Sequence, residues 1–167
     1  MIFSGSVSSG FSFSLAGSPA IGSESKAVDL STAQSIGNGT TGGQAQVGWA
    51  DNASIPANSV LSIDLRNADA SVLGLGGVVR FTEMRLIRVR NLETDTAKIA
   101  LIGCPTNGTD TTAYAARIRG GGKWEWESFA LGETVDDPTR YFTITNPGAS
   151  AVSVQIGLMG LGSFVDT

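Results

Sequence analysis

The sequence predicts an all-β protein, an antiparallel β-sandwich of the jelly-roll kind with about nine or ten strands. Short stretches of alternating apolar and polar residues, typical of strands with one buried face, recur along the chain. The chain contains 22 glycines and only 16% charged residues, as expected for strands joined by small polar turns. No window has the apolar spacing of a helix without an interrupting Gly, Pro or Asn. Long loops between several strands favour a jelly roll over an up-and-down barrel, and an immunoglobulin-type sandwich is the nearest alternative.

The strongest strand signal is the run 78–91, which is rich in β-branched and large apolar residues and contains no Gly or Pro. Both of its faces are partly apolar, so we expect it to be the central strand. Phe81 and Met84 lie three positions apart, which breaks the period of two. Both can face the core only if a bulge lies near Thr82 and Glu83.

The other expected strands follow the same alternation and end at Gly, Pro or polar clusters. They are expected at 11–15, 28–36, 44–49, 60–65, 98–103, 114–119, 124–131, 141–146 and 152–158. The stretch 98–103 follows the central strand after a short polar turn at 93–96, so we expect these two strands to pair antiparallel.

The chain is expected to form one sandwich domain, 11–167, preceded by an N-terminal arm, 1–10. A chain of 167 residues can bury a core without a metal or a disulfide. The arm consists mostly of Ser and Gly, so burial offsets little of the entropy lost on ordering it. Ile2 and Phe3 are the exceptions and could fill a neighbour's groove. We expect the arm to be mobile in the free protein, and its deletion to weaken assembly without unfolding the sandwich.

Composition excludes several classes of function. The chain has no histidine, so a Ser-His-Asp or Cys-His arrangement is impossible and zinc sites of the usual type are excluded. The net charge of −4 opposes a nucleic-acid partner held through its phosphates, and no apolar run is long enough for a membrane span. The single Cys104 cannot form an internal disulfide. We expect no cofactor, metal, nucleic-acid partner or membrane partner.

Two carboxylate pairs leave a glycan hydrolase as a minor alternative. They are Glu125 with Glu127, and Asp136 with Asp137. Neither pair sits in an identifiable apolar pocket that would raise a carboxyl pKa, so a polar strand face and a solvated loop are the preferred interpretations. We therefore expect no catalytic residue.

Six residues are candidates for an interface. Arg88 and Arg90 lack obvious partners nearby in the sequence, and arginine bonds carboxylates within a domain or across a subunit boundary. Trp124 and Trp126 share one strand face, which indicates either core or an interface anchor, with core preferred. The candidates are Ile2, Phe3, Arg88, Arg90, Trp124 and Trp126. We expect the protein to self-associate around a symmetry axis as a homotrimer.

Several turn and strand signals occur together in a fixed order. They are Ser35-Ile36-Gly37-Asn38-Gly39-Thr40-Thr41-Gly42-Gly43-Gln44-Ala45, then Asp51, Ile63-Asp64-Leu65, Gly76-Gly77, Phe81-Thr82-Glu83-Met84-Arg85 and Val89-Arg90-Asn91. This order resembles a pattern common in tailed-bacteriophage virion proteins. Those proteins carry a Gly-Thr-Gly turn followed by Gln-Ala, an Asp-Leu strand end, and a strand of the type Phe-x-x-hydrophobic-Lys. Met84-Arg85 stands where Val-Lys is usual, and residues 1–30 fall outside the resemblance.

The resemblance implies a non-enzymatic virion structural protein made in the cytoplasm of a bacterial host. The preferred role is a capsid decoration or cement protein that binds the major capsid protein on the head surface. The alternative is a head-fibre, tail or baseplate module that binds a receptor or glycan on the host surface.

Overall fold

The computed structural model describes residues 2–16, 27–42, 44–73, 76–103, 114–128, 132–137 and 140–166. Within these residues nearly all regular structure is β strand, and the one helical element is a short 3-10 turn, η1 (Ala70–Leu73). The strands form layers of mostly antiparallel sheet. The predicted all-β antiparallel sandwich is therefore confirmed.

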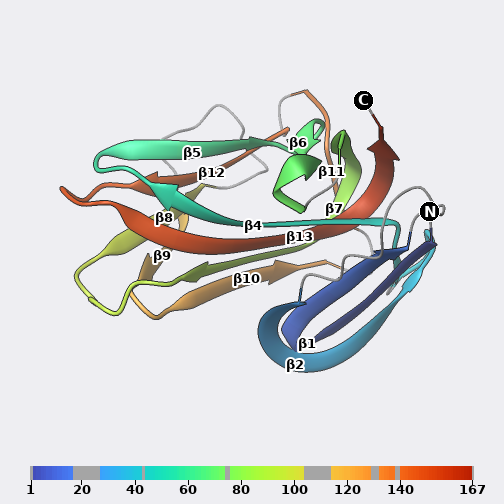
Figure 1. The fold of residues 1–167 in the computed structure, drawn as a ribbon, viewed down its shortest axis with the longest axis horizontal. Coiled ribbons are helices and arrows are strands. Elements are labelled where there is room, and N and C mark those ends of the chain that lie inside the picture. The colour runs from blue at the N-terminus through green and yellow to red at the C-terminus, as the bar shows by residue number, and fades with distance from the viewer. Residues whose placement is uncertain are drawn as a thin grey trace.

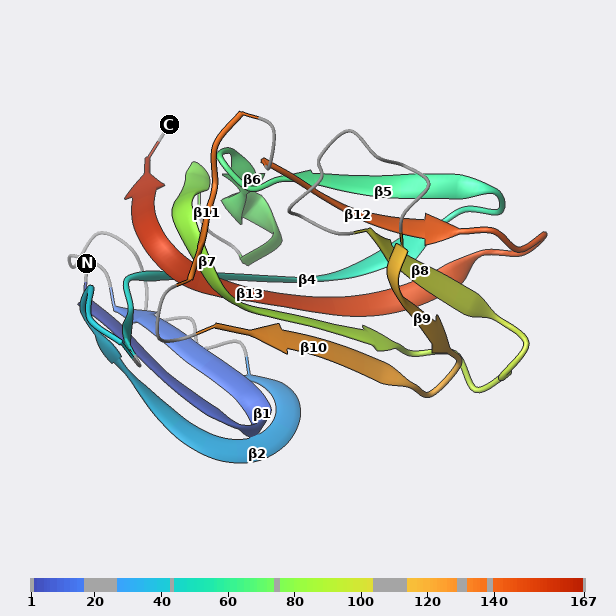
Figure 2. The same cartoon turned by 180° about the vertical axis from the view of Figure 1, so that it is seen from behind.

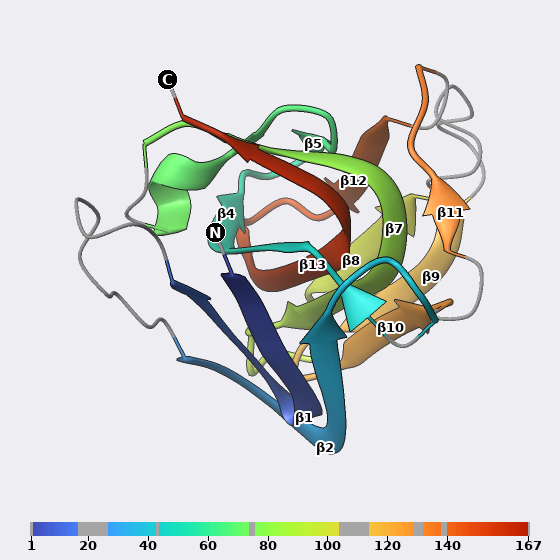
Figure 3. The ribbon, with the colours of Figure 1, turned by 90° about the vertical axis from the view of Figure 1, so that its right-hand side faces the viewer.

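Eight strands build the sandwich itself. They are β4 (Val47–Ile55), β5 (Ser59–Asp64), β7 (Val78–Asn91), β8 (Ile99–Gly103), β9 (Tyr114–Arg119), β10 (Lys123–Glu127), β12 (Tyr141–Asn146) and β13 (Val152–Val165). One sheet has the order β10-β7-β13-β4, and we call it the β7 sheet. The other has the order β5-β12-β8-β9, and we call it the β12 sheet. Figure 3 looks along the sandwich, with the two sheets facing each other.

The remaining strands extend or cover the β7 sheet. They are β1 (Ile2–Ala16), β2 (Ala27–Asn38), β3 (Gln44–Ala45), β6 (Ala68–Asp69) and β11 (Glu133–Thr134). β6 and β11 each pair with β7, while β1, β2 and β3 form a third sheet in that order. The β1–β2 pair lies on the side of the β7 sheet that faces away from the β12 sheet (Figures 1 and 2). Ten of the strands described have five or more residues, in line with the nine or ten expected.

The expected boundary between arm and sandwich does not coincide with the end of a strand. β1 runs without a break through residue 10, and its backbone pairs with β2 from Gly5 opposite Ile36 to Ser12 opposite Ala27. The strand expected at 11–15 is therefore longer, because the Ser- and Gly-rich residues before it continue the same ladder. The mobility of the arm in the free protein stays a prediction.

The central strand β7 has the bounds predicted from the sequence. Its ladder with β13 is irregular at two places, where Thr82 and Arg85 each lack a partner in register. The bulge expected near Thr82 is confirmed, while the bulge at Arg85 was not expected. Because of this irregular pairing, Phe81 and Met84 are both buried, each with 1% of its surface exposed.

Two glycines on β13 allow it to follow the bulged part of β7. Gly160 lies opposite Met84 and Gly162 lies opposite Phe81. A Cβ at Gly160 would clash with the carbonyl oxygen of Glu83, and one at Gly162 would clash with that of Arg80. The two strands approach so closely here that no larger residue fits without a shift of the backbone.

The pairing expected between the central strand and 98–103 is wrong. β8 lies in the β12 sheet, between β12 and β9, so the chain crosses from one sheet to the other after Asn91. The fully buried Asn91 side chain donates hydrogen bonds to the carbonyl oxygens of Lys98, at 3.1 Å, and Ile118, at 3.3 Å. This amide ties the β7 sheet to the β12 sheet where the chain crosses, which a short polar link alone does not reveal.

The core lies between the two sheets. Alternate residues of β7 and β13 face inward, as cross-strand neighbours on one side of the sheet. Apolar residues of the β12 sheet meet them from the other side. Among its most completely buried residues are Ile87, Val89, Val154, Ile156 and Leu158 from the β7 sheet, and Ile102, Phe142 and Ile144 from the β12 sheet.

Candidate functional site

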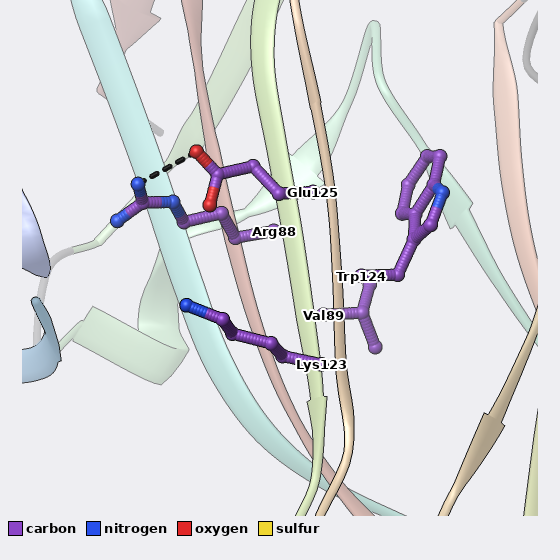
Figure 4. Close-up of a pocket in the computed structure, with 5 residues that line it drawn as sticks. All are labelled: Arg88, Val89, Lys123, Trp124 and Glu125. Carbon is purple, nitrogen blue, oxygen red and sulfur yellow. Dashed lines mark hydrogen bonds and ion pairs between the residues drawn. The ribbon is translucent and has the colours of Figure 1, made fainter. Parts of the chain in front are cut away.

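The pairing of β7 with β10 brings four of the six candidate interface residues together. Arg90 lies opposite Lys123, Arg88 opposite Glu125, and Val89 opposite Trp124. Successive strand residues point to opposite faces, so the arginines lie on the outer face of the β7 sheet and the tryptophans on the inner face. Figure 4 shows this division, with Arg88, Glu125 and Lys123 on one side and Trp124 on the other.

Trp124 and Trp126 are partly buried and pack against the hydrophobic core. Their strand is the edge of the β7 sheet, so each indole covers the margin of the space between the two sheets. The preferred interpretation from the sequence, that these residues are part of the core, agrees with this placement. Neither ring forms a fully exposed aromatic platform of the kind that stacks on a sugar.

Arg88 is nearly buried, and its Nη2 atom lies 2.7 Å from Oε1 of Glu125 on the neighbouring strand. The Glu125 side chain is 29% exposed, so the pair lies at the border between the outer face of the sheet and solvent. The sequence predicted that the arginines would pair with carboxylates, and Arg88 does so within the chain. A charge in this position is stabilised because its partner is fixed by the β7–β10 ladder.

Arg90 differs from Arg88 in being exposed. Its cross-strand neighbour is Lys123, which is also exposed and carries the same charge. Among the residues described, no carboxylate lies within ion-pair distance of Arg90. Arg90 therefore remains available for an outside contact. The predicted roles of the Ile2 and Phe3 side chains, and of Cys104, lie outside the described residues.

A small pocket lies at the β7–β10 pair (Figure 4). It is lined by Arg88, Val89, Lys123, Trp124 and Glu125. Its volume of about 10 Å³ is room for about one water molecule. A cavity of that size cannot enclose a substrate, so the pocket is a packing feature of the two strands.

The sequence did not single out Arg85 as a site, although the structure makes its guanidinium a centre of contacts. The side chain is 3% exposed. Its Nε atom donates to Glu83 Oε1 at 2.6 Å, and its Nη atoms donate to three carbonyl oxygens of a loop. Those acceptors are Thr40 at 2.9 Å, Thr41 at 2.5 Å and Gln44 at 2.6 Å. Arg85 thereby clamps the loop between β2 and β3 onto the central strand.

The clamped loop is itself held by a side chain. Oε1 of Gln44 accepts hydrogen bonds from the backbone N–H of Thr41, at 3.1 Å, and from its hydroxyl, at 2.8 Å. Gly39, with φ of 153°, packs against the same glutamine, where a Cβ would clash with the side-chain amide. The Gly-Thr turn, the Gln-Ala dipeptide and the basic residue of the central strand therefore form one structural unit. Backbone carbonyl acceptors have no sequence signature, which is why the unit was not foreseen.

The carboxylates form structural ion pairs. Burial tends to raise the pKa of Asp64, but hydrogen bonds from the Arg140 side chain and the Arg66 backbone outweigh it and lower the pKa below its ordinary value. Hydrogen bonds from the Lys98 ammonium and the Ser153 backbone N–H lower the pKa of Glu93. Lowered carboxyl pKa values keep these groups charged and do not suit a general acid.

The carboxylate pairs weighed for hydrolysis are not arranged as a matched pair. Glu125 is bound to Arg88, whereas Glu127 is exposed on the same strand. Asp137 lies 2.6 Å from Arg66 in an exposed ion pair. In the described part of the chain, no group of three or more Cys, Asp or Glu side chains could hold a metal ion. A search of the same residues for a long apolar helix that could cross a membrane found none.

Comparison of the chain with family models, curated proteins and solved structures found no match.

Proposed function

We propose that the protein is a non-enzymatic bacteriophage virion structural protein. In this proposal it is a capsid decoration or cement protein that binds the major capsid protein on the head surface, as a homotrimer, and stabilises the shell. The strand order carries the proposal, together with the resemblance in the sequence. The alternative is a head-fibre, tail or baseplate module that binds a receptor or glycan.

The strand order supports a jelly roll. The eight sandwich strands can be counted in chain order from β4, the first, to β13, the eighth. In the β7 sheet the first (β4) pairs with the eighth (β13), and the third (β7) pairs with the sixth (β10). In the β12 sheet the second (β5) pairs with the seventh (β12), and the fourth (β8) pairs with the fifth (β9). A long two-stranded ribbon rolled up on itself gives this order, and two Greek keys of this kind define a jelly roll. Viral capsid proteins use this architecture.

The clamp at Arg85 supports the resemblance to phage virion proteins. The Gly-Thr turn with its Gln-Ala dipeptide and the strand motif that ends at Arg85 are separated by about 40 residues, yet three hydrogen bonds of the Arg85 guanidinium join them to each other. Motifs that form a single contact unit have a physical reason to occur together. The contact therefore favours a real resemblance to phage virion proteins over a chance match of unconnected turn signals.

Jelly rolls also occur in lectins, so the choice of role depends on the candidate residues. The glycan-binding alternative needs exposed aromatic rings, whereas Trp124 and Trp126 are partly buried against the core. A decoration protein instead needs a charged or polar surface for contact with the shell. Exposed Arg90 beside Lys123 supplies such a surface and supports the capsid role.

Electron microscopy of phage particles with and without this protein tests the proposal. We expect density for the protein at the junctions between capsomers, and heads that lack it should rupture at lower temperature. A fibre that projects from head or tail would favour the receptor-binding alternative. Purified particles that contain none of the protein, by mass spectrometry, would contradict both roles.

A further inference from the structure

As far as the structure describes the chain, the sandwich has four edge strands, and three of them are protected. Edge strands present unpaired backbone groups, and proteins protect them with charged side chains or cover them. The β10 edge carries Lys123, Glu125 and Glu127, and the β9 edge carries Arg117 and Arg119. The β4 edge is partly covered, because the Trp49 indole N–H donates a 2.7 Å hydrogen bond to a carbonyl oxygen of β6.

Within the described residues, the β5 edge has no such protection. Its residues from Ser59 to Ile63 are uncharged, and it contains no proline, lysine or bulge. The one charge, Asp64, lies at its end and is bound to Arg140. Val60 on this strand is 58% exposed, more than any other large apolar side chain described. This strand is therefore the part of the sandwich best suited to accept another strand.

The register of β5 shows which backbone groups are free. Leu65 donates its backbone N–H to the carbonyl oxygen of Arg140 at 2.7 Å, in the same antiparallel register as the β5–β12 ladder. Hydrogen-bonded pairs alternate in an antiparallel ladder, so Ile63, Leu61 and Ser59 bond to β12. The N–H and C=O groups of Val60 and Ser62 point the other way. No other part of the described chain hydrogen-bonds to these four groups.

We propose that β5 pairs with β5 of a second copy of this chain, antiparallel about a twofold axis at Leu61. The backbone N–H and C=O of Val60 then bond to the C=O and N–H of Ser62 in the second copy. Ser62 of the first copy bonds to Val60 of the second copy in the same way, which gives four backbone hydrogen bonds in total. The two β12 sheets become one continuous sheet.

The strand is complementary to itself in this arrangement. Leu61, which packs against the core from the inner face, meets Leu61 of the second copy, and Val60 meets Ser62. Asp64 lies opposite Asn58 of the other copy, so no two like charges face each other. A twofold contact uses the same surface on both partners, as this strand does. The inference does not depend on the virion role, and the contact is separate from any trimer axis.

The first test is sedimentation of the full chain over a range of concentrations. We expect the wild type to associate reversibly through a contact that joins two chains, in addition to any contact around a trimer axis. In Ser62→Pro the free N–H is lost while the ladder to β12 is untouched, so association should weaken about tenfold or more. The matched control is Glu127→Pro on the β10 edge. Gly122 and Ser128 hydrogen-bond to β7, and bonded residues alternate along the ladder, so the N–H of Glu127 points away from β7 and is free. This variant should associate as the wild type does.

The second test does not depend on how Ser62→Pro folds. In the proposed pairing the two Leu61 residues form a pair without hydrogen bonds, with Cα atoms about 4.5 Å apart, which permits a disulfide. Leu61→Cys should become a covalent dimer of twice 17.2 kDa under mild oxidation. Ser54→Cys on β4, with the same native Cys104, is the control and should stay uncrosslinked.

Three results would overturn the pairing. The first is a wild type that stays monomeric at its highest soluble concentration. The second is Leu61→Cys crosslinking no faster than Ser54→Cys. The third is a trimer that Ser62→Pro dissociates, because a twofold contact cannot close a trimer. Each result leaves the particle experiment on the virion role unaffected.

Discussion

The two faces of β7 are buried in different ways. On the inner face, Ile87 and Val89 pack against apolar residues of both sheets and are at most 1% exposed. On the other side, Arg85 and Arg88 are almost as deeply buried, at 3% and 5%. Apolar side chains have only to fill the space between the sheets, and their interactions have no preferred direction. A buried guanidinium instead needs hydrogen-bond acceptors at fixed positions around its N–H groups. The comparison shows that one strand can organise two layers by different physical means.

The difference extends to the layers themselves. The inner face joins the two sheets of the sandwich, while Arg85 joins the β7 sheet to the loop that follows β2. Substitutions on the inner face should therefore lower the stability of the whole sandwich. Loss of an arginine should act first on the attachment of the neighbouring segment.

The largest effect is expected from Ile87→Ala. Ile87 is completely buried, so the substitution leaves a cavity and should lower the free energy of unfolding by about 2–5 kcal/mol. Chemical denaturation monitored by tryptophan fluorescence measures this change. Leu92→Ala, at an exposed position just after β7, is the control, with an expected change below about 0.5 kcal/mol. Equal effects of the two substitutions would mean that the inner face is not the core.

Arg85→Met should have the next largest effect. Methionine keeps the apolar part of the side chain but loses the hydrogen bonds to Glu83 and the loop, which should cost about 1–3 kcal/mol. Limited proteolysis should cut the loop at 39–44 faster in the variant than in the wild type. Arg80→Met, at an exposed position of the same strand, should change neither property. A loop that stays protected in Arg85→Met would show that the clamp does not hold it.

The ion pair between Arg88 and Glu125 should have a smaller coupling energy. A double-mutant cycle with Arg88→Met and Glu125→Gln should give about 0.5–1.5 kcal/mol, because the partly exposed carboxylate is screened by water. Glu125→Gln alone should cost more than Arg88→Met alone, since it leaves the more deeply buried charge of the pair without its carboxylate. Additive effects would mean that the two charges contribute independently.

Local features of the fold could be predicted from the sequence, and long-range ones could not. The bounds of β7 and its bulge near Thr82 were predictable because a break in alternation is a property of adjacent residues. The crossing between the two sheets from Asn91 to Ile99 was not predictable, since a short polar link has the same sequence pattern whether it closes a hairpin or connects two sheets. The contact made by Arg85 was hidden for a related reason. Its acceptors are backbone carbonyls about 40 residues away, and any residue type supplies a carbonyl.

The smallest effect is expected at the half-buried pair between Asp64 and Arg140, where β5 ends. Burial raises the pKa of Asp64, but the hydrogen bond from Arg140 outweighs it, so the folded protein has a pKa below the ordinary value of 3.8. A lowered carboxyl pKa contributes stability above the unfolded value, and this contribution is lost as the pH falls through the folded value.

Thermal unfolding between about pH 5 and pH 2 measures this loss. The melting temperature of the wild type should fall more steeply over that range than that of Asp64→Asn, because the variant has no carboxylate at position 64 to protonate. The difference should shrink at high salt, which screens a partly exposed pair but leaves the buried inner face of β7 unaffected. A variant that loses stability with acid as steeply as the wild type would place the acid sensitivity at other carboxylates, among which Glu93 also has a lowered pKa.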